Sequence, residues 1–385
     1  MPRSARQILE CLVSFPTVSR DSNLDLANWV EDFLRASKIE PHRMLNEDGT
    51  KAAIFASVGP DLPGGVVLSG HTDVVPVDGQ NWSTDPWEIV EHDGKLFGRG
   101  TCDMKGFDAI ALAAMAKART ADLKRPLQIA LSYDEEVGCE GAPPLIQAMQ
   151  GVVPKADVAI IGEPSMMKVV TGHKGGSGFQ IHIRGHEVHS SIMHTGVNAI
   201  MEGAKLVEWA NAMNDANRAA TPSPLAAIFE PPWTTVHVGM MSGGTAHNIT
   251  AKDCRFGLDF RFVPGEDPEE WSMRFLDQVA QIRADMQLVH PDTGIDVQPY
   301  FGVPALKPEK DGAAERLTRT LTGDNGAHVV SYGTEAGHFQ EGGYSAVVCG
   351  PGDIAQAHQP DEFITLDQIE AGEAFMDRLI DYLCK

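Results

Sequence analysis

Three short apolar runs in the first half of the chain each end in acidic or histidine residues, and this pattern constrains the fold strongly. The runs are "GGVVLSGHTDVVP", "PLQIALSYDEE" and "ADVAIIGEP". In an open α/β sheet, ligands bind outside the carboxyl ends of the buried strands. The three runs therefore predict an α/β sheet with a single site at the ends of its strands.

The second run ends in three consecutive carboxylates, Asp134, Glu135 and Glu136. Like charges at the mouth of a buried strand repel one another and lose hydration, which raises their pKa values unless a cation lies among them. The stretch is therefore either a solvated corner or part of a cation-binding site.

The pattern changes in the middle of the chain. "SGFQIHIRG", "WTTVHVGMMSGG" and "CRFGLDFRFVPG" alternate like strands, whereas "NAIMEGAKLVEWANAM" and "DPEEWSMRFLDQVAQIRADM" have helical spacing. This β-α-β-β-α order is typical of a ferredoxin-like α+β unit. The apolar run "SAVVCGPGD" then resumes the α/β pattern. We therefore predict a main α/β domain over residues 1–176 and 290–385, interrupted by a smaller inserted α+β domain over residues 177–289.

Glycines lie near one crossing between the two predicted domains. Gly172, Gly175 and Gly176 occur in "TGHKGGSG". They are either hinge residues between the two domains or ordinary turn glycines.

Charge and cysteine content narrow the class of partner. The 385-residue chain has a formal net charge of −22, which argues against nucleic acid or an anionic membrane as a partner. No stretch approaches the ~18 uninterrupted apolar residues of a membrane-spanning helix. Six scattered cysteines without paired spacing suit a reducing compartment. We therefore expect a cytoplasmic protein that acts on a small molecule.

Several residues at the ends of apolar runs are candidate metal ligands. Each alone has a plainer explanation, since Asp103 could cap the helix that follows it and Glu163 could be a solvated turn residue. Together, two imidazoles and several carboxylates suit a two-zinc site in which one carboxylate bridges the metals. The same ligand types also accept cobalt or manganese. The candidates are His71, Asp103, Glu135 or Glu136, Glu163 and His358.

Motifs spread over nearly the whole chain identify a family. They include "GHTDVVPVDG", "HDGKLFGRGTCDMKGF", "DEEVGCEGA", "IIGEP", "GHEVHSSIMHTGVNAI", "GGTAHNIT", "TEAGHFQ" and "GPGDIAQAHQPDEF". Together they resemble the zinc-dependent amidohydrolases related to acetylornithine deacetylase and succinyl-diaminopimelate desuccinylase. The resemblance is closest to the acetylornithine deacetylase branch.

The resemblance implies a fold and a ligand set. The fold would be a mixed-sheet, zinc-peptidase-like catalytic domain with an inserted ferredoxin-like dimerisation (lid) domain. Asp103 would bridge two zinc ions. His71 and Glu163 would complete the ligands of one ion, and Glu136 and His358 those of the other.

The resemblance also implies roles beside the metals. Glu135 would be the general base, which takes a proton from water and passes it to the leaving amine. Asp73 would hydrogen-bond the far nitrogen of His71 and orient its ring. The peptide bond between Asp103 and Met104 is expected to be cis. Cys102, next to the bridging aspartate, is either a small buried hydrophobe or a reactive, metal-binding thiol.

The inserted domain would contribute to substrate binding. By resemblance, His189 would donate a hydrogen bond to the developing oxyanion from the second subunit of a homodimer. Asn248 and Arg261 would hold the substrate's carboxylate, although Arg261 could equally be a solvated strand residue. The turn after "VHSS" lacks the proline expected from relatives, so the resemblance does not determine the conformation of the loop around His189.

The implied activity is hydrolysis of an N-acyl-L-amino acid, with N-acetyl-L-ornithine giving L-ornithine and acetate in arginine biosynthesis. The alternatives in the same class are a succinyl-diaminopimelate desuccinylase, another N-acyl amino acid deacylase or a dipeptidase. An alternative of a different class is a non-catalytic, metal-binding relative that keeps the fold.

Overall fold

The computed structural model describes residues 3–385, which form two compact units. The first unit comprises the chain up to Gly172 together with Leu306–Val329 and Thr334–Lys385. The second unit comprises His173–Ala305 and Val330–Gly333. Each unit has its own hydrophobic core.

The first unit is built on a mixed sheet with strand order β1-β2-β6-β3-β7-β15-β8-β14. Strands β6, β3, β7 and β15 run parallel to one another, and β1 and β2 are antiparallel at one edge. A small separate sheet has the order β16-β5-β4. The strands of this unit are β1 (Pro41–Leu45), β2 (Ala52–Val58), β3 (Val66–His71), β4 (Val90–His92), β5 (Lys95–Phe97), β6 (Leu127–Ser132), β7 (Val158–Pro164), β8 (Val170–His173), β14 (His328–Val330), β15 (Ser345–Gly350) and β16 (Phe363–Thr365).

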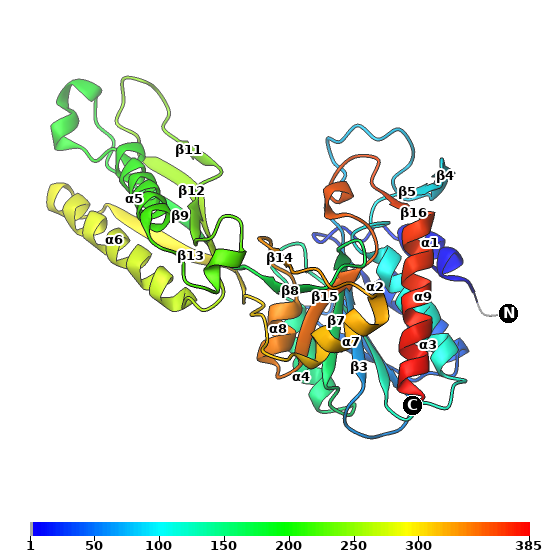
Figure 1. Ribbon diagram of the computed structural model, residues 1–385. Coiled ribbons are helices and arrows are strands. Elements are labelled where there is room, and N and C mark those ends of the chain that lie inside the picture. Colours follow the sequence, from blue (N-terminus) through cyan, green and yellow to red (C-terminus); the bar gives the residue numbers. More distant parts are fainter. Residues whose placement is uncertain (1–2) are drawn as a thin grey trace. The chain divides into compact units, whose positions relative to one another are not determined.

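Helices cover both faces of this sheet (Figure 1). Side chains alternate between the faces along a strand, so Leu127, Ile129 and Leu131 of β6 join the main core while Gln128 and Ala130 do not. That core also contains residues of α1, α2, α3, α7 and α9, whereas α4 and α8 contact each other outside it. The helices are α1 (Ala5–Val13), α2 (Leu24–Ala36), α3 (Lys105–Ala118), α4 (Ala142–Gln150), α7 (Ala313–Thr322), α8 (Ala336–Glu341) and α9 (Leu366–Leu383).

The strand register brings the predicted functional ends together. Val66 of β3 pairs with Leu127 of β6 and with Val158 of β7, and all three strands run in the same direction. His71, at the end of β3, is paired with Ser132, at the end of β6. The segments that follow these strands therefore leave the sheet on the same side, at the carboxyl ends of the strands (the carboxyl edge of the sheet). This is where an α/β sheet binds ligands.

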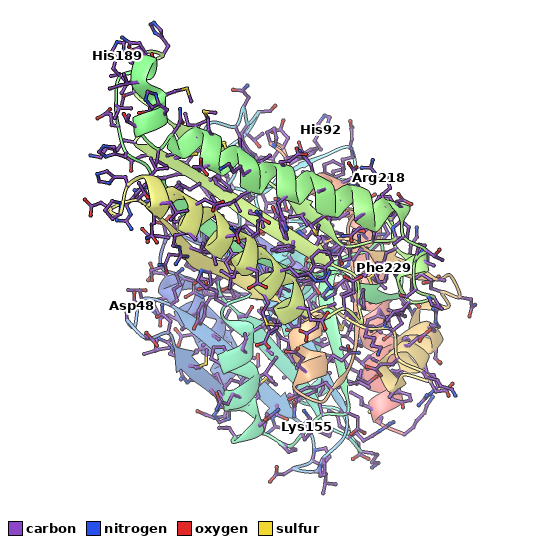
Figure 2. The ribbon with its side chains drawn as sticks, turned by 90° about the vertical axis from the view of Figure 1, so that its left-hand side faces the viewer. Asp48, His92, Lys155, His189, Arg218 and Phe229 are labelled. Atoms are coloured by element: carbon purple, nitrogen blue, oxygen red, sulfur yellow. The ribbon has the colours of Figure 1, made fainter. Side chains whose placement is uncertain are left out.

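The second unit is an antiparallel sheet with two long helices on one face (Figures 1 and 2). Its strand order is β10-β12-β9-β13, with β11 also paired to β12. Phe179, Phe260 and Phe275 lie at the centre of its core. The elements are β9 (Gly175–Arg184), α5 (Ala199–Ala219), β10 (Thr235–His237), β11 (Met241–Gly243), β12 (Asp253–Phe262), α6 (Pro268–Val289), β13 (Gly294–Val303) and the short 3-10 helices Ser190–Thr195 and Ala226–Ile228.

The mixed α/β sheet and the α+β insert predicted from the sequence are confirmed. The second unit extends beyond the predicted insert of residues 177–289, because β13 pairs with β9 along most of its length. β13 has an irregular register between Pro299 and Phe301, and many of its residues are exposed. It therefore lacks the regular alternation by which the other strands were predicted.

Among residues 3–385, no helix combines the length and the apolar character that crossing a membrane requires.

Candidate metal centre

Five of the predicted ligands meet at the carboxyl edge of the first unit's sheet. The His71 Nε2 atom lies 3.1 Å from Asp103 Oδ1 and 3.7 Å from Glu163 Oε1. The His358 Nε2 atom lies 3.2 Å from Asp103 Oδ2 and 3.0 Å from Glu136 Oε2. Each oxygen of Asp103 thus faces a different imidazole, and each imidazole also faces at least one glutamate.

The buried carboxylates are better suited to binding a cation than to lying close together without one. Glu136 Oε1 and Glu163 Oε1 are buried and have no hydrogen-bond partner. Burial raises the pKa of Glu136 to about 7 and that of Glu163 well above its usual range, and repulsion from Asp103 adds to both shifts. Unpaired buried oxygens are costly, and a divalent cation reverses the local pKa balance by favouring ionised carboxylates. The nitrogen and oxygen donors are of the kinds that zinc accepts.

Asp103 lies just before α3 and does not cap it. The N-cap residue is Met104, which follows a cis peptide bond, as predicted. Burial disfavours the charged form of Asp103, but hydrogen bonds from His358 and His71 hold the pKa of its carboxyl well below the usual range. The helix-cap explanation is therefore replaced by a carboxylate shared between two imidazoles.

The residue before Asp103 is a buried, hydrogen-bonded thiol. Cys102 is buried, and its Sγ donates to the carbonyl oxygen of Asp353 over 3.3 Å. Burial and the charge of Glu362 raise the thiol's pKa far above its usual value. A high pKa suppresses the nucleophilic thiolate, which favours the small-hydrophobe interpretation of this residue.

Glu135 lies beside the ligands. Its Oε2 atom is 4.0 Å from His71 Nε2, and its Oε1 atom accepts a hydrogen bond from Cys139 Sγ over 3.3 Å. Burial raises the pKa of Glu135 to about 8, with a contribution from the charge of Glu136. One oxygen of Glu135 belongs to a group with His71 and Glu163 whose donor atoms all lie within 4.8 Å of one another. Glu135 can therefore reach a molecule bound between these residues.

Asp73 holds the acidic loop as well as His71. The His71 Nδ1 atom lies 2.9 Å from the backbone oxygen of Asp73 and 3.6 Å from its Oδ1 atom, so the shorter contact is to the backbone rather than to the predicted carboxylate. The carboxylate itself accepts hydrogen bonds from the Ser19 hydroxyl and from the backbone N–H groups of Glu135 and Glu136. Sequence reasoning missed this role, because backbone donors leave no residue pattern.

The predicted residues of the inserted domain lie at two ends of its sheet. His189 is exposed and starts a short 3-10 helix at the tip of the second unit (Figure 2). The N–H of Ser190 donates to the carbonyl oxygen of Asn248, so the two segments are adjacent. Arg261 lies near the other end of β12, where it pairs with Gly176. The strand between Asp253 and Arg261 spans about 26 Å at ~3.3 Å per residue.

A family model matches most of the chain, and a curated relative matches almost all of it. The model described as "Peptidase family M20/M25/M40" matches residues 67–382. The chain belongs to this family. It is 33% identical over 392 residues to an acetylornithine deacetylase from Myxococcus xanthus, which covers 98% of this chain and 97% of the relative.

Solved structures share the M20 fold at low sequence identity. An M20 family metallo-carboxypeptidase from Sulfolobus solfataricus superposes with a TM-score of 0.82 at 15% identity, covering 99% of each chain. A dinuclear metal-binding M20 peptidase from Bacillus subtilis superposes with a TM-score of 0.64 at 15% identity, covering 98% of this chain and 97% of the other. The chain is thus an M20 metallohydrolase similar to acetylornithine deacetylases.

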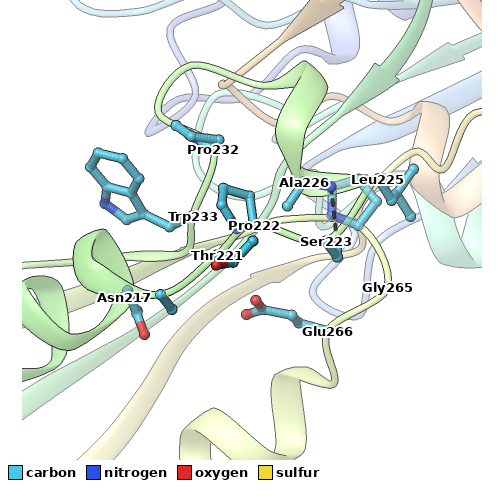
Figure 3. A pocket seen from close by; sticks show the side chains of 12 residues that line it. Asn217, Thr221, Pro222, Ser223, Leu225, Ala226, Pro232, Trp233, Gly265 and Glu266 are labelled. Carbon is cyan, nitrogen blue, oxygen red and sulfur yellow. Dashed lines mark hydrogen bonds between the residues drawn. The ribbon is translucent and has the colours of Figure 1, made fainter.

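A pocket of about 380 Å³ also lies within the second unit of this M20 chain (Figure 3). Trp233, Pro222 and Glu266 are among its lining residues, and none of the predicted site residues lines it. The Oε2 atom of Glu266 already accepts hydrogen bonds from the Thr234 hydroxyl and the Trp271 indole. This pocket is therefore not part of the candidate metal centre.

Proposed function

We propose that this chain hydrolyses the amide bond of an N-acyl-L-amino acid, with N-acetyl-L-ornithine as substrate and L-ornithine and acetate as products. The observation that carries the proposal is the cluster of two imidazoles and three carboxylates with Glu135 beside it. The proposed acyl group and amino acid are supported by the similarity to an acetylornithine deacetylase that matches over 98% of the chain. This activity would place the protein in arginine biosynthesis in the cytoplasm.

Two zinc ions are the proposed cofactors, with cobalt or manganese as alternatives of the same ligand preference. His71 and Glu163 would hold one ion and Glu136 and His358 the other, with Asp103 shared. The two faces of Asp103 support this division, because each of its oxygens lies within 3.2 Å of one imidazole. Divalent ions at such a site supply Lewis acidity, which polarises a carbonyl oxygen and lowers the pKa of water.

Glu135 is the proposed general base. It would take a proton from the attacking water at Oε2, since Oε1 is engaged by the Cys139 thiol. It would then return that proton to the amine nitrogen as the carbon–nitrogen bond breaks. Asp73 would keep Glu135 in place, because its carboxylate accepts a hydrogen bond from the backbone N–H of Glu135.

The substrate-binding residues support a homodimer. Asn248 lies in the loop before β12, beside Ser190, whereas Arg261 lies near the far end of that strand. The strand from Asp253 to Arg261 alone spans about 26 Å at ~3.3 Å per residue, which favours a site to which two chains contribute. We propose that His189 and Asn248 come from one subunit and Arg261 from its partner, and that His189 stabilises the oxyanion. Exposed apolar side chains near α5 and β11 suit a subunit interface. They are Ile200, Met201, Met240 and Met241.

A substrate panel tests the proposed activity. The zinc-loaded protein is assayed for amine release from N-acetyl-L-ornithine, N-acetyl-L-methionine, N-succinyl-L,L-diaminopimelate and an unmodified dipeptide. We expect the highest kcat/KM for N-acetyl-L-ornithine. Equal values for the two acetylated substrates would indicate a general deacylase instead, and turnover of the dipeptide alone would indicate a peptidase.

A further inference from the structure

We propose that Glu362 and Arg99 are positioning residues that hold Asp103 and His358 in place as ligands of one metal ion. This inference rests on the proposed metal centre and concerns residues that do not touch the metals. It extends to Gln80, which joins the pair to the backbone of His358.

The Glu362 carboxylate binds the loop that carries Asp103. Its Oε1 atom accepts the backbone N–H groups of Cys102 and Asp103, over 2.8 and 3.0 Å. Its Oε2 atom accepts the N–H of Gly100 over 3.0 Å and Arg99 Nη1 over 2.7 Å. Glu362 is buried, so these four donors are the groups that satisfy its charge. Hydrogen bonds to an ionised acceptor are about twice as strong as neutral ones.

Arg99 extends this contact toward His358. Its guanidinium is buried, lies 5.0 Å from the Trp82 ring centroid and donates from Nη2 to Gln80 Oε1 over 2.6 Å. Gln80 Nε2 in turn donates to the backbone oxygen of His358 over 2.9 Å. A continuous hydrogen-bonded path therefore runs from the backbone of Asp103 through Glu362 and Arg99 to the backbone of His358.

His358 needs such support more than the other imidazole ligand. His71 lies at the end of β3, where pairing with β6 fixes its backbone. His358 lies in a loop with φ of 62°, a conformation that a residue other than glycine keeps only when its surroundings impose it. Asp361, in the same loop, also has a positive φ and accepts hydrogen bonds from Ser83. The two proposed metal positions therefore differ in how their ligands are held.

The inference predicts an unequal loss of metal when the path is cut. In Glu362→Gln, the side-chain amide places a donor against backbone or guanidinium donors while keeping the size of the side chain. We expect wild-type protein to bind two zinc ions per chain in calorimetric titration of the metal-free form. We expect the variant to keep one ion with wild-type affinity and to bind the other ~10–100-fold more weakly, the usual effect of removing a partner of a metal ligand.

Three further variants make the titration decisive. His358→Ala shows which of the two zinc-binding steps is weakened in Glu362→Gln, because its titration isotherm should lack that same step. Gln80→Ala removes the direct link to the His358 backbone at a partly exposed residue and leaves only the longer 3.4 Å hydrogen bond from Arg99 Nη1 to the Gln359 carbonyl oxygen. It should weaken the same ion even if Glu362→Gln fails to fold. Glu309→Gln is the matched control. The Glu309 carboxylate also accepts a backbone N–H and the Ser345 hydroxyl, but it does so at the start of β15, away from the carboxyl end of that strand. This control variant should leave both affinities unchanged.

Two results would overturn the inference. One is unchanged zinc affinity in both Glu362→Gln and Gln80→Ala, and the other is an equal weakening of both ions in folded variants. A wild-type protein that binds fewer than two zinc ions would instead contradict the proposed metal centre, so the two failures are distinguishable.

Discussion

At the level of a single residue, Glu135 is the proposed general base, and its replacement separates a loss of proton transfer from a loss of metal. Its carboxylate lies next to the ligands, yet one of its oxygens is occupied by the Cys139 thiol. Replacing Glu135 with Ala should lower kcat by about 10²–10⁴, the usual contribution of a general base. Zinc content measured by atomic emission should stay near two ions per chain in this variant.

The same substitution can contradict the assignment in two ways. Retention of most of the activity would show that Glu135 is not the base. Loss of one zinc ion together with the activity would show that Glu135 is a ligand, which its distance from His71 and Glu163 also permits.

The charges of the metal centre predict how the metal-free protein responds to pH. Burial raises the pKa of Glu135 to about 8 and that of Glu136 to about 7. An acid whose pKa is higher in the folded state than in the unfolded state binds more protons when the protein is folded. Its stabilising effect is full below the pKa of the unfolded state and is lost as the pH rises through the pKa of the folded state. Hydrogen bonds to Asp103 and Glu136 raise the pKa of His358 to about 10, which acts in the same direction above the unfolded value.

The melting temperature of the metal-free protein should therefore fall between pH 5 and pH 8, relative to that of the zinc-loaded form. Groups away from the centre titrate alike in both forms, so the difference between the two melting temperatures isolates the cluster. We expect this difference to widen with pH in differential scanning calorimetry. A difference that stays constant or narrows would mean that the clustered carboxylates are not held near one another without metal.

At the level of the elements, α3 and β7 approach each other closely at the residue before Glu163. Gly162, which precedes Glu163, has no room for a side chain, because a Cβ atom there would lie 2.0 Å from the Cγ atom of Phe107. Gly162→Ala should lower the free energy of unfolding by about 1–3 kcal/mol, as overpacking of a core usually does. Urea denaturation measures this change.

Gly302→Ala is the control for this substitution. Gly302 is also a strand glycine, in β13, but a Cβ atom there would meet nothing within 4 Å. Its unfolding free energy should change by no more than ~0.5 kcal/mol. Equal destabilisation by both substitutions would show that contact with Phe107 is not the reason for glycine at position 162.

The sequence predicts those elements whose pattern is local. The strands β3, β6 and β7 are mostly apolar runs that end at or close to acidic or histidine residues. Their type and the site at their ends could therefore be predicted from neighbouring residues. The proposed bridging role of Asp103 and the proposed metal-binding role of His358 needed the family resemblance, because neither residue lies at the end of a predicted parallel strand.

Features that depend on distant backbone could not be predicted. Glu362 accepts N–H groups about 260 residues earlier in the chain, and any residue could supply such a donor. Gly175 and Gly176, considered as hinge or turn residues, lie within β9, where a Cβ atom on Gly175 would meet Val303 O at 2.8 Å. The partner strand that requires glycine there, β13, was itself not predicted.

At the level of the whole molecule, the proposed homodimer can be tested by mixing inactive subunits. Glu135→Ala removes the base from one chain, and His189→Ala removes the proposed oxyanion donor that acts in the partner's site. Random reassortment makes half of the dimers mixed, each with one complete site in two, so we expect about a quarter of the wild-type activity. Activity is measured after the two purified variants are unfolded together and refolded.

Two observations would contradict this arrangement. A mixture as inactive as either variant would show that His189 and Glu135 act within one chain. Full activity of His189→Ala alone would remove His189 from the mechanism.

The central claim is that residues far apart in the sequence hold two metal ions around one shared carboxylate. Zinc-edge anomalous diffraction from crystals of the zinc-loaded protein tests it most directly. The account predicts two peaks ~3.5–4 Å apart, both in contact with Asp103. One should also contact His71 and Glu163, and the other Glu136 and His358. A single peak, or two peaks of which Asp103 contacts only one, would contradict the account.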